Sequence, residues 1–228
     1  MDSMYEILMG LPLFKGVSRQ RISEIVGMAK LHFMKYLAGE TVISVGSPCT
    51  HITFIISGSV RVSIKNPDGR FCVSQTLKAP DIISPEYLFG RATTYPCTAV
   101  AEVPTGILQI SKTDYLKILD TDRVFLFNFL NILSRSAQKS VDGVLALTNG
   151  SLRERIAFWI ICLTQPGGID VKLTCRQRDL YSLFGVPRSS LIATLDAMKA
   201  EGLITYAPGE ISVVSRPALL ATLVTNAE

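Results

Sequence analysis

The sequence is poor in the residues that bind metals. Its two histidines, His32 and His51, fit neither the H-x-x-x-H nor the H-E-x-x-H spacing of a metal site. Its five cysteines are scattered and contain no C-x-x-C pair, which argues against a disulfide framework, a zinc site or an iron–sulfur cluster. We therefore expect no metal and no resident cofactor. The cysteines are Cys49, Cys72, Cys97, Cys162 and Cys175.

Long hydrophobic runs and enzyme motifs are absent as well. No apolar run reaches the ~18–20 residues that span a bilayer, and the opening MDSMYEILMG lacks the basic and apolar regions of a secretion signal. We expect a soluble, cytoplasmic protein with no membrane partner. There is no G-x-S-x-G, no phosphate-cradling glycine loop and no metal-ligand spacing, so we do not expect an enzyme.

Charge is sparse, and its distribution is more informative than its total. Charged residues make up 18% of the chain and the net charge is +4. Lys172, Arg176, Arg178 and Arg188 lie close together and face only Asp179. Such a cluster on a nearly neutral chain favours docking of a polyanion, the alternative being a solvated helix face.

The first half of the chain changes from helical to β texture. Residues 1–30 carry apolar positions at helical spacing, broken by Pro12 and Gly16, and predict two short helices. Residues 33–111 then hold short β-rich runs between turn residues, which is typical of a sandwich or barrel. Asn66-Pro-Asp-Gly69 is a strong hairpin signal. The predicted strands are Glu40–Val45, Ile52–Ser57, Ser59–Lys65, Phe71–Leu77, Thr98–Glu102 and Gly106–Ser111.

Residues 122–147 predict one long helix with a narrow apolar seam. The seam steps by four and three and has one polar break, at Ser140. A homodimer is the favoured partner for such a seam over another helix of the same chain. Gly150 and Ser151 suit the end of this helix and the start of the next. The seam consists of positions 126, 130, 133, 137, 140, 144 and 147.

The densest motif is LTCRQRDLYSLFGVPRSSLIATLDAMKAEGLITYAPGEISVV. Thr174 and Gln177 fit a capping box that opens a helix, and Gly185-Val186 makes a tight turn before a second helix. A hairpin follows around Ala207-Pro-Gly209, and the order is that of a winged helix-turn-helix. Arg188 stands where an arginine reads guanine, whereas Lys172, Arg176 and Arg178 are better placed for phosphates. The predicted DNA-binding residues are Lys172, Arg176, Gln177, Arg178, Arg188, Ser189, Ser190 and Ala193.

At this point the chain resembles the Crp–Fnr superfamily of bacterial transcription regulators. The resemblance rests on AGETVISVGSPCTHITFIISGSVRVSIKNPDGR (38–70), LRERIAFWIICL (152–163) and LFGVPRSSLIATLDAMKAEGLI (183–204). It implies an α+β fold: a cyclic-nucleotide-binding-like jelly roll over 1–121, a dimerisation helix over 122–148, and a winged helix-turn-helix over 149–228. It also implies a homodimer on a palindromic double-stranded DNA operator, with RNA polymerase as a further partner.

The sequence departs from the family's effector site. Members that bind cyclic AMP hold its phosphate with an Arg-Ser pair, and here Tyr95-Pro96 stands in that place. A phosphate buried without a cationic partner is costly, so cyclic AMP is not expected. Glu86 matches the ribose-contacting position, and Ser140 matches a hydroxyl that the long helix offers to the effector, although it is equally a tolerated polar position. The effector-binding candidates are Glu86, Tyr95, Cys97 and Ser140.

Three questions stay open at this level. Redox sensing through Cys49, Cys72 or Cys97 competes with the interpretation of these residues as inert core thiols. The recognition helix keeps the first arginine of the family's Arg-Glu-x-x-x-Arg but has Ser189 and Ala193 in the other two places, so the usual half-site cannot be carried over. The alternative to a DNA-binding regulator is an adaptor whose winged helix contacts protein.

Overall fold

The structure is a computed structural model that describes residues 2–148 and 150–224. The described chain divides into two compact units. The first unit runs up to Val62 and includes Leu77–Ser136, and the second comprises Ser63–Thr76 and the chain from Ala137 onwards. A hairpin segment from the first half of the sequence therefore belongs to the second unit.

Short helices open the first unit. They are α1 (Asp2–Gly10), η1 (Pro12–Phe14) and α2 (Arg19–Met28), as the apolar spacing predicts. Ser18 caps α2, its side-chain oxygen accepting from the Arg21 amide at 3.3 Å. Leu8, Leu13 and Ile22 are fully buried, so these helices belong to the core.

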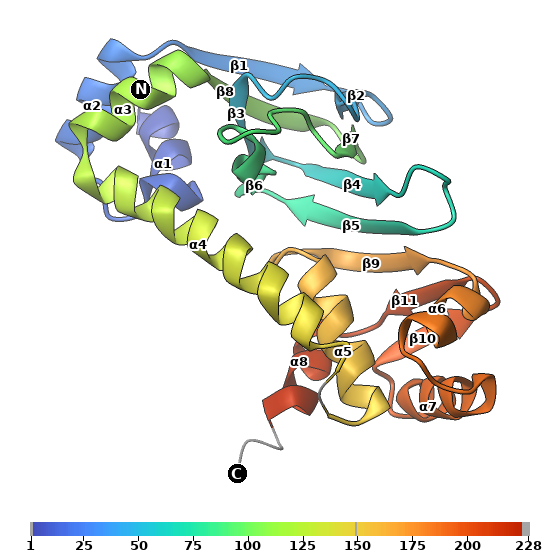
Figure 1. Ribbon diagram of the computed structural model, residues 1–228. Helices are drawn as coiled ribbons and strands as arrows, with labels where there is room; N and C mark the ends of the chain where they lie inside the picture. Colours follow the sequence, from blue (N-terminus) through green and yellow to red (C-terminus); the bar gives the residue numbers. More distant parts are fainter. Residues whose placement is uncertain (1, 149, 225–228) are drawn as a thin grey trace. The chain divides into compact units, whose positions relative to one another are not determined.

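Two antiparallel groups of strands form the β part of the first unit (Figure 1). A four-stranded sheet has the order β1-β8-β3-β6, and β2 pairs with β7. The jelly-roll fold class is confirmed, while β1 and β6 are additions to the predicted strands. The bounds are β1 (Leu31–Tyr36), β2 (Thr41–Ile43), β3 (His51–Ser57), β6 (Asp81–Ile83), η2 (Pro85–Tyr87), β7 (Cys97–Ala101) and β8 (Thr105–Ser111).

Two helices follow the strands: α3 (Lys112–Thr121) and the long α4 (Arg123–Leu145). The predicted long helix is confirmed, but its seam is displaced by one residue at several positions. Leu126, Leu133 and Leu147 are half-buried, and the last two pack against the cores of their own units. The displacement arises because α4 has two neighbouring apolar faces. One of these faces packs against the core of its own chain, and only the other remains exposed.

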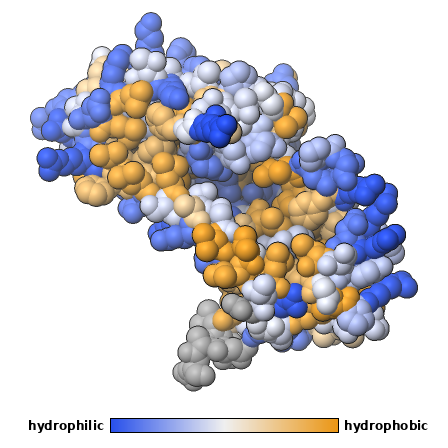
Figure 2. Space-filling view, viewed as in Figure 1, coloured by the Kyte–Doolittle hydropathy of each residue, from blue (hydrophilic) through white to orange (hydrophobic). Residues whose placement is uncertain are grey.

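A ridge of exposed residues remains on α4, stepping by three and four. Phe127 is 61% exposed and Val144 is 67% exposed, values that are high for large apolar side chains. Figure 2 shows apolar side chains at the surface over the first turns of α4 and again near its end. We call this set the α4 ridge: Phe127, Leu130, Ser134, Ala137, Val141 and Val144.

The second unit is built on α5 and a sheet of order β10-β11-β9-β5. Ser151 is the N-cap of α5 and makes a full capping box with Glu154, which confirms the predicted start of this helix. Gly150 has φ +84°, but it does not end the long helix as predicted, because α4 already ends at Leu145. The core contains Trp159, Leu173 and Leu195. The bounds are α5 (Leu152–Leu163), β9 (Ile169–Thr174), α6 (Gln177–Leu183), α7 (Arg188–Ala200), β10 (Ile204–Ala207), β11 (Glu210–Val213) and α8 (Arg216–Val224).

The strands β4 (Ser59–Lys65) and β5 (Cys72–Lys78) each begin in one unit and end in the other. The turn between them is the predicted one, with Gly69 at φ +69° and its amide bonded to the Asn66 carbonyl at 3.0 Å. In the second unit β5 pairs antiparallel with β9, Val73 lying opposite Leu173. Val73 is buried in the core of this unit, so the segment is part of its fold.

The predicted capping box of Thr174 and Gln177 is wrong. Thr174 ends β9, and the N-cap of α6 is Arg176, which makes no side-chain cap bond. Pairing with β5 and β11 extends the chain through Thr174, so tertiary pairing overrides the local capping signal. Strand β9 and helix α8 have no counterpart among the predicted elements.

Candidate DNA-binding and effector sites

A helix-turn-helix lies in the second unit. Helix α6 ends at Leu183, and the chain turns through Gly185, which has φ +63°. The Val186 amide closes the turn by donating to the Tyr181 carbonyl at 3.0 Å. Pro187 is the N-cap of α7. The geometry fits the motif because glycine adopts the positive φ at no steric cost.

Helix α7 separates a buried face from an exposed one. Leu191, Leu195 and Met198 are buried and anchor the helix on the core. The first turn of α7 points its polar side chains to the surface, where Arg188, Ser189 and Ser190 are all exposed, as is Ala193 one turn later. An exposed helix start of this kind can enter a major groove.

A two-stranded wing follows. Strands β10 and β11 pair antiparallel, with Ile204 opposite Val213 at one end and Ala207 opposite Glu210 at the other. Gly209 in the turn between them has φ +88°. The Tyr206 hydroxyl of β10 donates to the carboxylate of Asp196 on α7 and so connects the wing to α7. The predicted hairpin is therefore confirmed.

The predicted cations all lie on the surface of the second unit. Lys172 is on β9, Arg176 caps α6, and Arg178 and Gln177 are in the first turn of α6. Lys172 Nζ lies 4.0 Å from Glu210 Oε1, both about half exposed, which is a weak pair in water. Within the described residues Arg176, Arg178 and Arg188 make no ion pair, so their charges are available to an anion.

Two arginines of α5 support this arrangement, and sequence reasoning missed them. Arg155 Nη2 donates to the Phe184 carbonyl at 2.7 Å, and its guanidinium lies 5.5 Å from the centre of the Phe184 ring. Arg153 is ion-paired with Glu201, the residue after α7, at 2.5 Å. Both hold an end of a helix of the motif against α5. The available signal was a pair of arginines opening an otherwise apolar helix, LRERIAFWIICL.

Two of the effector candidates, Tyr95 and Cys97, are buried in the first unit. Tyr95 is 6% exposed, and its hydroxyl donates to the His51 carbonyl at 3.2 Å. Burial raises the pKa of the Tyr95 phenol, and its hydrogen bond with Cys49 raises it further. Ser84 has a left-handed backbone, with φ 45°, and its Oγ lies 3.6 Å from Cys97 Sγ. Tyr95 is thus an internal, neutral group.

Glu86 and Ser140 are both exposed. Glu86 lies on η2 in the first unit, and its charge helps to raise the pKa values of the Cys49 and Cys97 thiols, although burial is the larger cause. Ser140 lies on the part of α4 that belongs to the second unit, where it lines a hollow of about 270 Å³ together with Cys162. Their predicted contacts with an effector stay a prediction.

The cysteines and histidines form no metal site among the residues that the structure describes. All five cysteines are free thiols. The rings of His32 and His51 meet edge to face with centroids 6.2 Å apart, and burial lowers the pKa of His51, with a smaller effect from His32. In the same part of the chain, no helix has the length and apolar character to cross a membrane.

Comparison with known proteins finds one matching domain family and several sequence relatives. Residues 33–122 match the cyclic nucleotide-binding domain family. The "Cyclic AMP receptor protein" of Thermus thermophilus is 25% identical over 211 residues, covering 90% of this chain and 93% of that protein. The "cAMP-activated global transcriptional regulator Vfr" of Pseudomonas aeruginosa is 24% identical over 197 residues, covering 82% and 91%.

Solved structures agree on the fold. The catabolite activator protein of Thermus thermophilus aligns over 95% of this chain and all of that one, with a TM-score of 0.50 and 21% identity. The sensor domain of the regulator DNR from Pseudomonas aeruginosa covers 66% of this chain and 96% of that one, with a TM-score of 0.53 and 20% identity. The chain is therefore similar over most of its length to proteins named as CRP-type transcription regulators, and its residues 33–122 match a cyclic nucleotide-binding domain.

Proposed function

We propose that this protein is a homodimeric regulator that binds a palindromic DNA operator with its winged helix-turn-helix. The observation that carries the proposal is the first turn of α7, where Arg188, Ser189 and Ser190 are exposed beside the unpaired cations of α6. Arg188 reads a base edge, because a guanidinium can bridge guanine O6 and N7. Lys172, Arg176 and Arg178 contact phosphates, which fix position without reading sequence.

The α4 ridge supports the dimer. Large apolar side chains that are 45% to 67% exposed along one helix face, such as Leu130 and Val144, are unusual in a monomer. Burying them against a second copy gives a two-fold dimer in which two recognition helices are spaced one DNA turn apart, about 34 Å. We assign sensing to residues 1–121, dimerisation to 122–148 and DNA binding to 149–228, with RNA polymerase as a further partner in the cytoplasm.

We further infer that the sensor part does not bind cyclic AMP, although the relatives are named for it. Support comes from Tyr95, which occupies the family's arginine position, is buried and is already hydrogen-bonded to the chain. A cyclic phosphate there would lose its hydration without gaining a cationic partner. Any other effector that activates must bind the DNA-competent state more tightly than the alternative state.

Selection of bound DNA from a random library tests the proposal. The full-length protein is used with and without an extract of small metabolites, and with cyclic AMP alone. We expect a palindrome to be enriched, with an enrichment that cyclic AMP does not change. Enrichment of no sequence under any condition would contradict DNA binding and favour the protein-contacting adaptor. Enrichment that depends on cyclic AMP would contradict the inference about Tyr95.

A further inference from the structure

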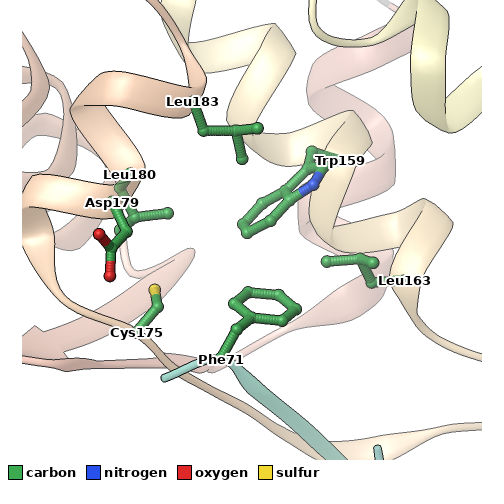
Figure 3. Close-up of a pocket in the computed structure, with 7 residues that line it drawn as sticks. All are labelled: Phe71, Trp159, Leu163, Cys175, Asp179, Leu180 and Leu183. Atoms are coloured by element: carbon green, nitrogen blue, oxygen red, sulfur yellow. The ribbon is translucent and has the colours of Figure 1, made fainter. Parts of the chain in front are cut away.

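A hollow of about 320 Å³ lies beside α6 in the second unit (Figure 3). Of its lining residues, only Phe71, from the segment between β4 and β5, belongs to the matched cyclic nucleotide-binding domain. The volume is at the lower end of the range for small-molecule sites. The lining residues are Phe71, Trp159, Leu163, Cys175, Asp179, Leu180 and Leu183.

Aromatic rings fix one side of the hollow. The Trp159 indole packs against two other rings, with its centroid 5.6 Å from that of Phe71 and 5.6 Å from that of Phe184. Its six-membered ring points into the open space in Figure 3. Because Trp159 packs against two rings, it offers a third aromatic ring a rigid surface at little cost in side-chain entropy.

Asp179 is the only charged residue of the lining. Figure 3 places its carboxylate on the side of the hollow opposite Trp159 and Leu163, next to the sulfur of Cys175. Among the residues that the structure describes, the Asp179 carboxylate makes no ion pair and no hydrogen bond, although Arg176 and Arg178 are near in sequence. These arginines do not line the hollow.

The thiol beside Asp179 does not compete for this role. Burial, followed by the charge of Asp179, raises the pKa of Cys175 to about 11, so the thiol is neutral near pH 7. The polar end of the hollow is therefore a hydrogen-bond acceptor with one negative charge. From this geometry we propose that the hollow binds a small aromatic molecule whose polar end is a hydrogen-bond donor, with the ring against Trp159 and the donor on Asp179.

The only tryptophan of the chain lies in the hollow, so its fluorescence reports binding directly. Three probes with the same ring and different ends are titrated into the full-length protein: 2-phenylethylamine, 2-phenylethanol and 3-phenylpropionate. We expect saturable changes with the amine and the alcohol. The carboxylate should bind at least about tenfold more weakly than the amine, because it faces Asp179 with like charge. Saturation-transfer NMR with the same probes gives an independent measure of binding.

Two variants separate the donor contact from the apolar wall. Asp179→Asn should bring amine and carboxylate within about threefold of each other while the alcohol changes little, since the amide has no charge. Leu183→Gln should weaken the binding of all three probes. The Leu183 side chain is 43% exposed, so its replacement should cost little unfolding free energy. Asp196→Asn, a carboxylate on α7 outside the hollow, is the matched control and should change none of them.

Two results would overturn the proposal. One is the absence of saturable binding for all three probes by both methods. The other is a carboxylate that binds as tightly as the amine in the wild-type protein, or an amine preference that persists in Asp179→Asn. DNA selection uses none of these probes, so failure here leaves the proposed regulator function standing.

Discussion

Arg188 is the residue on which base recognition rests in the proposed regulator. It begins α7 and is exposed, and an arginine there can make two hydrogen bonds to one guanine. Arg188→Ala should weaken binding to the selected operator by about 1–3 kcal/mol and relax base preference at one position of each half-site. Competition binding against operators with single changes measures both effects.

Arg176 supplies the contrast at the same scale. As the N-cap of α6 it is assigned to a phosphate. Arg176→Ala should therefore weaken binding to all DNA sequences to a similar degree. If Arg188→Ala behaved in the same uniform way, α7 would not be reading sequence through that side chain. The pair of variants therefore separates positioning from recognition.

Cys175 makes stability depend on pH in the alkaline range. Burial raises the pKa of its thiol from 9.0 to about 11, with Asp179 contributing. The unfolded chain ionises first as pH rises, so this contribution is fully present below about pH 9 and is lost as pH rises towards 11. Its upper bound is about 2–3 kcal/mol, since each pKa unit corresponds to about 1.4 kcal/mol.

Urea unfolding between pH 8 and 11 checks this expectation. Cys175→Ser, which removes the thiol, should show a smaller loss of unfolding free energy over the same range. Cys72→Ser, at a half-buried thiol, should follow the wild-type curve. Identical curves for Cys175→Ser and the wild type would show that other groups carry the alkaline transition.

At the scale of elements, β5 makes a close contact with the turn that precedes β9. Gln75 is 5% exposed, and its side-chain oxygen accepts from the Gln165 amide at 2.8 Å. A Cβ on Gly168 would overlap that oxygen. Gly168→Ala should therefore displace Gln75 and lower the unfolding free energy by about 1–3 kcal/mol.

Gly27→Ala is the matched control for this substitution. Gly27 lies in α2 and a Cβ there would meet nothing within 4 Å, so alanine should be neutral or stabilise by up to about 1 kcal/mol. Thermal and urea unfolding of both variants give the comparison. If Gly168→Ala and Gly27→Ala had the same unfolding free energy, the Gln75 side chain would be able to move away from the added methyl group at no cost.

The α4 ridge makes an oligomer prediction. Val141→Glu with Val144→Glu places two carboxylates on the face assigned to a second copy, and the double variant should sediment as a monomer where the wild type is a dimer. Both side chains are at least 60% exposed within one chain, so the fold itself should tolerate the change. Arg135→Glu, on another face of α4, should leave the dimer intact; loss of the dimer in that variant as well would point to charge rather than to the ridge.

Local signals predicted those elements whose ends are set by nearby residues. The N-cap at Ser151 and the turn at Gly69 depend on contacts within a few residues, and both are confirmed. Strand β9 and the failed cap at Thr174 depend on pairing with β5, about a hundred residues earlier in the chain. The missed strand β1, with its exposed Phe33, shows no clear alternation of burial for a period-two pattern to detect.

At the scale of the whole molecule, the difference between local and long-range contacts also decides which site residues the sequence could predict. The first turn of α7 is contiguous in sequence, so local spacing alone predicts that Arg188, Ser189 and Ser190 lie together. The hollow beside α6 joins Phe71 to residues between 159 and 183, and the support of Phe184 by Arg155 joins two helices. No local spacing encodes these contacts, because they depend on which surfaces pack together.

Salt dependence tests the entire assembly at once. The proposed function assigns three cations of each head to phosphates, Lys172, Arg176 and Arg178. A dimer would then have six such contacts and a single head three. Counterion release predicts a slope of log K against log salt of about −5 for the dimer and about −3 for a single head. Titration of the selected operator at several salt concentrations measures the slope. The double variant at Val141 and Val144 should move it towards the single-head value, whereas a slope near zero in the wild type would mean that the winged helix contacts something other than a phosphate backbone.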